Sequence, residues 1–319
     1  MRTAARMSLD IHRAATRRPI LLCVDFDETI TLHDTTSLLF QLSSSSASTQ
    51  QQLVTQYVDE VSKFIRRYET KWQQQEHSSN RSRSFDCAGL REFLEGYAAV
   101  DLRSVQRVVE CRALKGIQHQ DLVKAASSVQ IRPNCAETLA VADEWNIISV
   151  NWNKKLVESV MTQAGVAHEA IQITANEMKV DRQGVTTGEI DVKVQSPMDK
   201  AQWIDKVQSM YAGTQPTVVY VGDSATDLLA LLAADIGIWI AADDTATSSA
   251  KLLRQLAENY GIDVHSTRIK PYLTDANTFR RMEHALTFID PTSLVFEPMY
   301  DMVHVDEKWF YEEVNKRSC

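Results

Sequence analysis

Short continuous runs of apolar residues recur along the chain and alternate with segments of helical periodicity. The apolar runs are residues 19–24, 147–150, 217–221 and 236–240. A continuous run is typical of a strand that is buried on both faces of a parallel sheet. The helical patterns between the runs cover residues 155–164, 200–210 and 227–234. Strands that alternate with helices predict an α/β fold whose core is a Rossmann-like, doubly wound parallel sheet.

Residues 35–145 follow a different pattern, because they show helical periodicity and no convincing strand. Leu53, Tyr57, Val61 and Phe64 recur every three or four residues and form one apolar face. A polar break at 73–84 predicts an exposed loop, and further helices are expected at 88–98, 101–113, 119–127 and 134–145. We therefore predict a helical cap over 35–145, inserted into a core made of 19–34 and 146–264, where it could close over the strand ends.

Three other segments have distinct patterns. Alternation after Met178, with Gly184 and Gly188, predicts a β-hairpin. Residues 265–319 are expected to pack on the core through a terminal helix with Trp309, with a partner-binding tail as the alternative. Residues 1–18 carry five arginines and one acid, which predicts a flexible tail or, alternatively, a mitochondrial presequence.

Composition and charge narrow the class of function. The chain has 319 residues with 34 basic and 42 acidic side chains, a formal net charge of −8, which argues against a general nucleic-acid binder. No apolar stretch approaches the length of about 18 residues needed to span a membrane. The five cysteines are scattered and form no CxxC pair, which favours free thiols in a reducing compartment, so we expect a cytoplasmic protein.

Asp25 and Asp27 follow the first apolar run directly, in the sequence Asp-Phe-Asp-Glu-Thr. Two carboxylates two residues apart at a strand end can serve one site in different roles. One can attack a phosphorus atom while the other moves protons. The alternative is a pair of solvated aspartates in a loop, one of them capping a helix.

Three further candidates lie at or near later strand ends. Asp223 and Asp227 stand four residues apart in Gly-Asp-Ser-Ala-Thr-Asp and suit Mg²⁺, which prefers hard oxygen ligands, although an ordinary strand-to-helix loop is the alternative. Ser149 ends the second strand and could hold a phosphate oxygen. Lys200 opens a helix and could neutralise a transferring phosphoryl group, or could simply be solvated.

The order DxDxT, serine, lysine and GDxxxD resembles the haloacid dehalogenase-like (HAD) superfamily of phosphohydrolases, with a helical cap of the first class. This resemblance covers about residues 19–242 and implies a Mg²⁺-dependent phosphatase. It implies that Asp25 is the nucleophile and Asp27 the general acid and base. Asp25, the Asp27 carbonyl and Asp223 would hold Mg²⁺ with Asp227 close by, and Ser149 and Lys200 would bind phosphoryl oxygens.

A finer resemblance concerns the leaving group. Ser149-Val150-Asn151-Trp152, Leu114-Lys115-Gly116-Ile117 and Ser196-Pro197-Met198-Asp199-Lys200 are similar to the HAD domain of plant thiamine monophosphate phosphatases. Asp34, Asn151 and Trp152 are therefore candidate substrate-binding residues, because an aromatic face can stack on a cationic ring. Trp152 could instead pack cap against core, and Asp34 could cap a helix. The rival functions are a phosphatase of phosphoserine, a nucleotide or a sugar phosphate, and a non-catalytic module that binds a phosphorylated partner.

Overall fold

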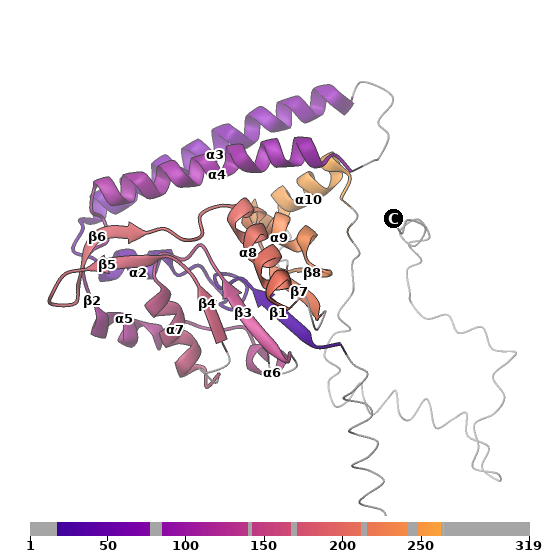
Figure 1. Ribbon diagram of the computed structural model, residues 1–319. Coiled ribbons are helices and arrows are strands. Elements are labelled where there is room, and N and C mark those ends of the chain that lie inside the picture. Colours follow the sequence, from indigo (N-terminus) through magenta and orange to yellow (C-terminus); the bar gives the residue numbers. More distant parts are fainter. Residues whose placement is uncertain are drawn as a thin grey trace, which may run out of the picture. The chain divides into compact units, whose positions relative to one another are not determined.

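The computed structural model describes residues 18–76, 85–139, 142–166, 171–211, 216–240, 248–262 and 264. Its centre is a parallel sheet with the strand order β4-β3-β1-β7-β8 (Figure 1). The strands are β1 (Ile20–Val24), β3 (Glu144–Ile148), β4 (Ile171–Thr174), β7 (Thr217–Gly222) and β8 (Ile236–Trp239). The chain runs outward from β1 to β4 and then returns to β7 on the other side of β1. The order therefore reverses at β1, as in a doubly wound fold, and the predicted α/β core is confirmed.

Side chains of β1 explain why its apolar run is continuous. Leu22 and Val24 belong to a buried cluster on one face of the sheet, and Leu21 and Cys23 belong to a second cluster on the other face. A strand that buries both faces has no position left for a solvated side chain. The first face is covered by α7 (Lys154–Gln163) and α5 (His119–Ala126), and the second by α8 (Pro197–Met210) and α9 (Leu228–Ala233).

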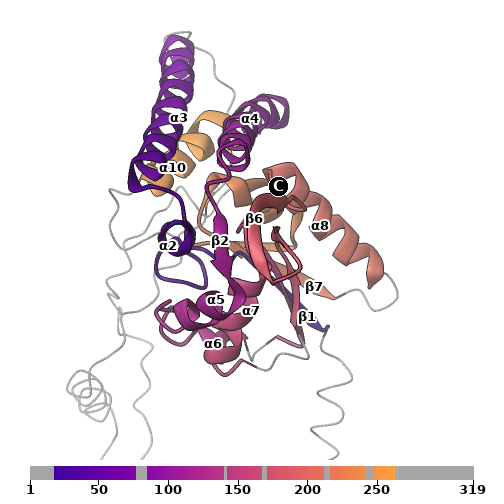
Figure 2. The same ribbon diagram turned by 90° about the vertical axis from the view of Figure 1, so that its left-hand side faces the viewer.

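Two long helices, α3 (Ala47–Glu76) and α4 (Cys87–Glu110), lie side by side above the sheet (Figures 1 and 2). The short helix α2 (Thr36–Leu42) leads from β1 into α3. The sequence predicts two helices at 88–98 and 101–113, but the structure has the single helix α4. No proline or glycine interrupts residues 97–110, so the helical hydrogen bonds continue. The predicted loop also begins too early, because residues 73–76 still belong to α3.

One strand lies inside the segment for which the sequence predicts helices alone. β2 (Lys115–Gln118) pairs with β6 (Val185–Asp191), which pairs with β5 (Glu177–Val180) in a small antiparallel sheet. β2 has four residues and only Ile117 is buried, so it carries too little pattern to be recognised.

Two other predictions concern segments near this sheet. The helix expected at 134–145 is wrong at its end, because α6 (Cys135–Leu139) is followed by β3 from Glu144. The predicted hairpin is confirmed as β5 and β6, and Gly184 adopts a φ of 77° at its turn.

The helix α10 (Ser248–Tyr260) packs under α3 and α4 at the end of the pair that is far from α2 (Figures 1 and 2). Trp72 of α3, Phe93 of α4 and Leu256 of α10 share a buried cluster with Ala225 and Leu228, which follow β7. The Trp72 indole also donates to the Tyr260 hydroxyl at 3.4 Å. This end of the helical pair is thus packed against elements of the core.

The predictions for residues 1–17 and 265–319 lie outside the described residues. The domain boundaries at 34/35 and 145/146 stay predictions. Among the helices that the structure describes, none combines the length and the apolar character that crossing a lipid bilayer requires.

Candidate active site

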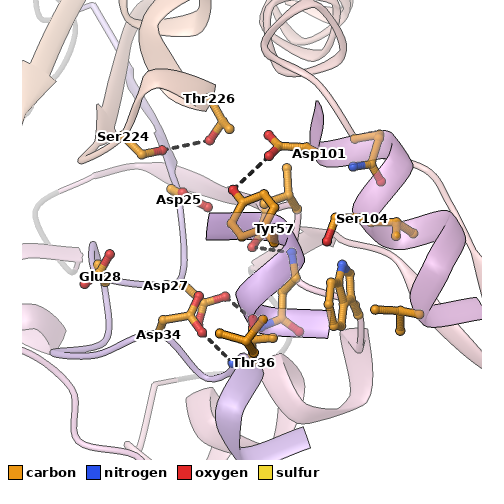
Figure 3. Close-up of a pocket in the computed structure, with 18 of the residues that line it drawn as sticks. Asp25, Asp27, Glu28, Asp34, Thr36, Tyr57, Asp101, Ser104, Ser224 and Thr226 are labelled. Carbon is orange, nitrogen blue, oxygen red and sulfur yellow. Dashed lines mark hydrogen bonds between the residues drawn. The ribbon is translucent and has the colours of Figure 1, made fainter. Parts of the chain in front are cut away.

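Three neighbouring strands bring the predicted residues to one edge of the sheet. Asp25 follows β1, Ser149 follows β3 and Asp223 follows β7, and all three line a single pocket. Figure 3 shows this pocket, with Asp25 among its labelled residues. The backbone N–H of Asp25 donates to the Val221 carbonyl at 2.9 Å, so the pairing of β1 with β7 continues up to the motif. The reversal of strand order at β1 opens a crevice at this edge, which is where ligands bind in such sheets.

Lys200 reaches this edge from the first turn of α8. Ser196 and Asp199 form a capping box that fixes the start of the helix. The Lys200 ammonium lies 2.9 Å from Asp25 Oδ2 and 2.7 Å from Asp227 Oδ1, and its side chain has no solvent exposure. Burial disfavours the charged form, but the two carboxylates outweigh it and raise the pKa of Lys200. The alternative of a solvated lysine is therefore excluded.

Asp227 is a fully buried carboxylate whose two oxygens accept five hydrogen bonds. Oδ1 accepts from Lys200 and from the Tyr220 hydroxyl at 2.6 Å. Oδ2 accepts from the backbone N–H groups of Asp223 and Ser224 and from the Ser224 hydroxyl. Burial opposes ionisation, yet the charge of Lys200 and these hydrogen bonds lower the pKa of Asp227 below its ordinary value. Gly222 makes room for this carboxylate, because a Cβ there would lie 2.4 Å from Asp227 Cγ.

Asp25, Asp223 and Asp227 are the one acidic group, among the described residues, that could hold a metal ion. One oxygen of each lies within 4.8 Å of the others. Burial and mutual repulsion raise the pKa of Asp25 to about 7 and that of Asp223 to about 8. Lys200 offsets only one of the three charges, so a divalent cation with a preference for carboxylate oxygens fits this group. Because Asp227 already accepts five hydrogen bonds, Asp25 and Asp223 have the freer oxygens, although Thr29 donates to Asp223 Oδ1 at 3.0 Å.

Asp27 lies apart from that acidic group and has its own set of partners. Its Oδ1 accepts from the backbone N–H and the hydroxyl of Thr35 at 2.9 and 2.7 Å, and its Oδ2 accepts from Asn151 Nδ2 at 2.7 Å. Burial first, and the nearby charge of Asp34 second, raise the pKa of Asp27 to about 6. A carboxyl group with such a pKa can give up and accept a proton near neutral pH.

The remaining predicted residues lie around these carboxylates. Ser149 is fully buried, and its Oγ accepts from the backbone N–H of Asn151 at 3.0 Å. Asn151 lines the pocket, but its amide already contacts protein at both ends, because Oδ1 accepts from the Asn153 N–H at 2.9 Å. Asp34 is exposed at the pocket and accepts from the Thr36 N–H at 2.7 Å, so it also stabilises the turn before α2. Trp152 lines the pocket and meets the Phe40 ring edge-on at 5.9 Å.

The pocket has a volume of about 310 Å³ and lies between the strand ends and the two long helices. This volume is at the lower end of the range of small-molecule sites, about 300–1,000 Å³. Helices α3 and α4 contribute Tyr57, Tyr97, Asp101 and Ser104. Sequence reasoning assigned Tyr57 to an apolar stripe and did not single out the other three, because nothing in a helical pattern shows which face meets a pocket. Thr29 belongs to the DxDxT motif and could have been recognised, whereas the contact of Thr35 with Asp27 has no signal in the sequence.

Comparison with known proteins gives one family and one distant curated relative. Residues 22–232 match the family model of the haloacid dehalogenase-like hydrolases. The chain is 26% identical over 275 residues to the bifunctional TH2 protein, mitochondrial, of Arabidopsis thaliana. The match covers 76% of this chain and 42% of the relative, so the chain spans less than half the length of that protein.

Solved structures with a similar fold include a phosphoserine phosphatase and a 5'-nucleotidase. A phospho-aspartyl intermediate analogue of phosphoserine phosphatase is 17% identical, with a TM-score of 0.45, and the match covers 75% of this chain and 91% of that one. Cytosolic 5'-nucleotidase IIIB bound to cytidine is 14% identical, with a TM-score of 0.48 and coverage of 75% and 77%. Since the family model spans most of the described core, the chain belongs to the haloacid dehalogenase-like hydrolase family, and the predicted resemblance to the HAD superfamily is confirmed.

Proposed function

We propose that the protein is a Mg²⁺-dependent phosphomonoesterase that acts on a small metabolite through an aspartyl-phosphate intermediate. One observation carries the proposal. The Asp25 carboxylate lies at the base of the pocket with Oδ2 on the Lys200 ammonium and Oδ1 on the Phe26 N–H, while Asp27 lies nearby in a separate hydrogen-bond set. Two carboxylates in different environments can divide nucleophilic and acid–base work between them.

In the first step an Asp25 carboxylate oxygen attacks the phosphorus atom, and the bond between phosphorus and the ester oxygen breaks. Asp27 gives its proton to the departing alkoxide, so the alcohol leaves neutral at that oxygen. In the second step Asp27 takes a proton from water, and the water oxygen attacks the aspartyl-phosphate. The bond from phosphorus to Asp25 then breaks and inorganic phosphate leaves. The Ser149 region would hold the phosphoryl oxygens, and Lys200, paired with Asp25, would offset the negative charge at the nucleophile. Phosphoryl transfer depends mainly on such positioning and charge stabilisation.

Asp25 and Asp223 would hold Mg²⁺, together with the backbone carbonyl of Asp27 that the family resemblance implies. When bound, the ion would neutralise charge on the phosphoryl oxygens. Asp227 acts, in this proposal, on Lys200: four other hydrogen bonds fix the carboxylate that holds the ammonium in place.

The lining of the pocket supports a leaving group that is not anionic. Six carboxylic acids and no lysine, arginine or histidine line it within the described part of the chain. An acidic pocket repels a carboxylate or a second phosphate and attracts a cation. The Trp152 side chain offers an aromatic contact to a ring, and a cationic ring gains more from it. Together with the sequence resemblance to the domain of plant thiamine monophosphate phosphatases, these features support thiamine monophosphate, or a related pyrimidine or thiazole phosphate, as the substrate.

The alternatives are a phosphatase of another small ester and a non-catalytic module. Phosphoserine would bring a carboxylate next to these acids, and a sugar phosphate would make little use of the aromatic wall. A module that only binds phosphorylated partners has no need of a nucleophile beside a buried lysine. We therefore place thiamine monophosphate first, another small ester second and the module last.

Phosphate release from a panel of monoesters tests the proposal. The panel contains thiamine monophosphate, phosphoserine, a nucleoside monophosphate and a hexose phosphate, each with Mg²⁺ and with a chelator. Wild type is compared with Asp25→Asn, which keeps the size of the side chain. We expect Mg²⁺-dependent release that is highest with thiamine monophosphate and absent in the variant. If the wild type releases no more phosphate than the variant from every ester, the proposed phosphomonoesterase activity is contradicted. Preference for the hexose phosphate would contradict the thiamine assignment alone.

For the compartment we keep the cytoplasm as the expectation from the cysteine pattern and the mitochondrion as the alternative. The Arabidopsis relative is named as a mitochondrial protein, which favours the alternative. Microscopy of the full chain with a C-terminal fluorescent protein would separate the two.

A further inference from the structure

Helices α3 and α4 place an acid and two phenols against the pocket, on the side away from the sheet. Tyr57 of α3 donates its hydroxyl to Asp101 Oδ1 of α4 at 2.8 Å, and Figure 3 shows the two side chains pointing toward one another. Tyr97 lies one helical turn before Asp101 and interacts with Tyr57. All three line the pocket that Asp25 and Asp27 line from below. They belong to no part of the phosphoryl-transfer chemistry.

The charge of Asp101 is not neutralised within the part of the chain that the structure describes. Its one recorded hydrogen-bond donor is the neutral Tyr57 hydroxyl, and no ion pair to it is found there. The arginines nearest along α4, Arg103 and Arg107, both pair with Glu60 of α3 at 3.2 and 2.7 Å. Burial raises the pKa of Asp101 to about 6, with the Tyr57 hydrogen bond acting against it, so the carboxyl is still ionised at neutral pH.

A half-buried carboxylate without a cation is costly, because it has lost water and gained no opposite charge. A ligand that carries a positive charge would supply the missing partner. The rest of the pocket offers Asp101 no cationic partner, since no basic side chain among the described residues lines it. The electrostatics of the two long helices and of the strand ends therefore favour the same kind of ligand group.

We propose that Asp101, oriented by Tyr57, binds a positively charged nitrogen-containing group of the leaving alcohol and so selects phosphate esters of cationic alcohols. This inference rests on the proposed phosphatase function and names the substrate class of that same site. Asp101 is then a specificity-determining residue that contacts the end of the substrate remote from phosphorus. The aromatic rings of Tyr97, from α4, and Trp152, from the loop after β3, line the same pocket.

Steady-state kinetics with two esters tests the proposal. One is thiamine monophosphate, whose leaving group is cationic, and the other is p-nitrophenyl phosphate, whose leaving group carries no positive charge. We expect Asp101→Asn to raise KM for thiamine monophosphate ~10- to 100-fold, the worth of one charge-assisted contact. The same variant should keep KM for p-nitrophenyl phosphate within ~2-fold of the wild-type value. Tyr57→Phe should shift KM in the same direction by less. The matched control for the lost charge is Asp59→Asn, because Asp59 is an exposed acid on α3 that does not line the pocket. This variant should leave KM for both esters unchanged.

Calorimetric binding of thiamine itself separates this inference from the proposed function, because binding of the alcohol needs no catalysis. Wild type should bind thiamine more tightly than an uncharged analogue with a thiophene ring, and Asp101→Asn should remove that preference. An equal effect of Asp101→Asn on both esters, or an unchanged preference for thiamine, would overturn the role of Asp101 even in an active enzyme. A protein that releases no phosphate but keeps the Asp101-dependent preference would overturn the phosphatase and leave the cation subsite standing.

Discussion

Lys200 donates from Nζ to Asp227 Oδ1 across 2.7 Å, and neither side chain is exposed to solvent. Asp227 is in turn fixed by Tyr220 and by the loop that follows β7. The ammonium is therefore held beside Asp25 by a carboxylate that itself cannot turn away. This arrangement keeps a positive charge at Asp25, the proposed nucleophile, without exposing it to water, where its effect on a phosphoryl group would be weaker.

Asp227→Asn should reduce both activity and stability. Breaking a buried ion pair on one side costs about 3–5 kcal/mol, and Lys200 then depends on Asp25 alone. We expect kcat to fall ~100-fold, as when one preorganised charge is disturbed, and the free energy of unfolding to fall by several kcal/mol. Denaturant unfolding and phosphate release measure the two effects. Asp205→Asn, an exposed acid on α8, is the control and should behave as wild type. Unchanged stability in Asp227→Asn would contradict the pairing.

Mg²⁺ should raise the melting temperature of the wild type, because a ligand that binds the folded state stabilises it by mass action. The three carboxylates repel one another, and burial and that repulsion raise the pKa of Asp223 to about 8. Asp223→Asn should abolish the shift caused by Mg²⁺ and should itself raise the melting temperature in a chelator, because one repelling charge is gone. Thermal scans of both proteins with and without the ion check this. A full Mg²⁺ shift in the variant would show that the ion binds elsewhere.

Asn151→Ala should lower kcat while KM changes little, because Asn151 positions Asp27 through the 2.7 Å hydrogen bond. A drop of ~10-fold or more is expected when a proton-transfer group loses its orientation. The control is Asn153→Ala, two residues further on. Asn153 accepts from the Leu156 N–H at 2.7 Å as the N-cap of α7, so its loss should cost about 1 kcal/mol of stability and no activity. A rise in KM with kcat unchanged in Asn151→Ala would instead identify Asn151 as a substrate contact.

Gly222→Ala should inactivate the enzyme by moving Asp227. The new Cβ would lie 2.4 Å from Asp227 Cγ, so the carboxylate and the Lys200 that it holds must shift. Overpacking of this kind costs about 1–3 kcal/mol. Gly184→Ala on the hairpin turn is the matched control, because nothing lies within 4 Å of its added Cβ and only the positive φ opposes it. The control should lose some stability and keep full activity, whereas retained activity in Gly222→Ala would contradict the steric argument.

Asp101→Asn should stabilise the protein at neutral pH, although it weakens substrate binding. The pKa of Asp101 is about 6 in the folded protein, above its ordinary value, so the folded state holds this proton more tightly than the unfolded state does. Wild-type stability therefore falls, on account of Asp101, as the pH rises from about 4 to about 6. The facing Tyr57 and Tyr97 have pKa values raised above their ordinary range and stay neutral throughout.

Melting temperatures at about pH 4.5 and about pH 7.5 check the sign of this linkage. The variant should exceed the wild type at the higher pH, and the difference should shrink at the lower one. Destabilisation by Asp101→Asn at neutral pH would mean that the carboxylate serves the packing of α3 against α4 and not a ligand.

The sequence by itself determined the α/β core and the candidate site residues that follow its strands. An apolar run that ends in an acid, as in β1 followed by Asp25, requires no partner to be recognised, because strand burial and motif spacing are local properties. The order of the motifs then fixed the family and the expected cap. The sequence determines helix ends less well, because the periodicity of α4 shows a buried face but not that the helix continues through residues 99 and 100.

Tertiary structure alone decided which side chains meet. Thr29 donates to Asp223 from a position 194 residues away, and Asn151 meets Asp27 across 124 residues. Tyr57 and Asp101 occupy ordinary positions on two amphipathic helices, and a helical pattern does not reveal whether its inner face packs on protein or borders a pocket. Their hydrogen bond, and the cation site that we infer from it, follow from how α3 and α4 are placed over the strand ends.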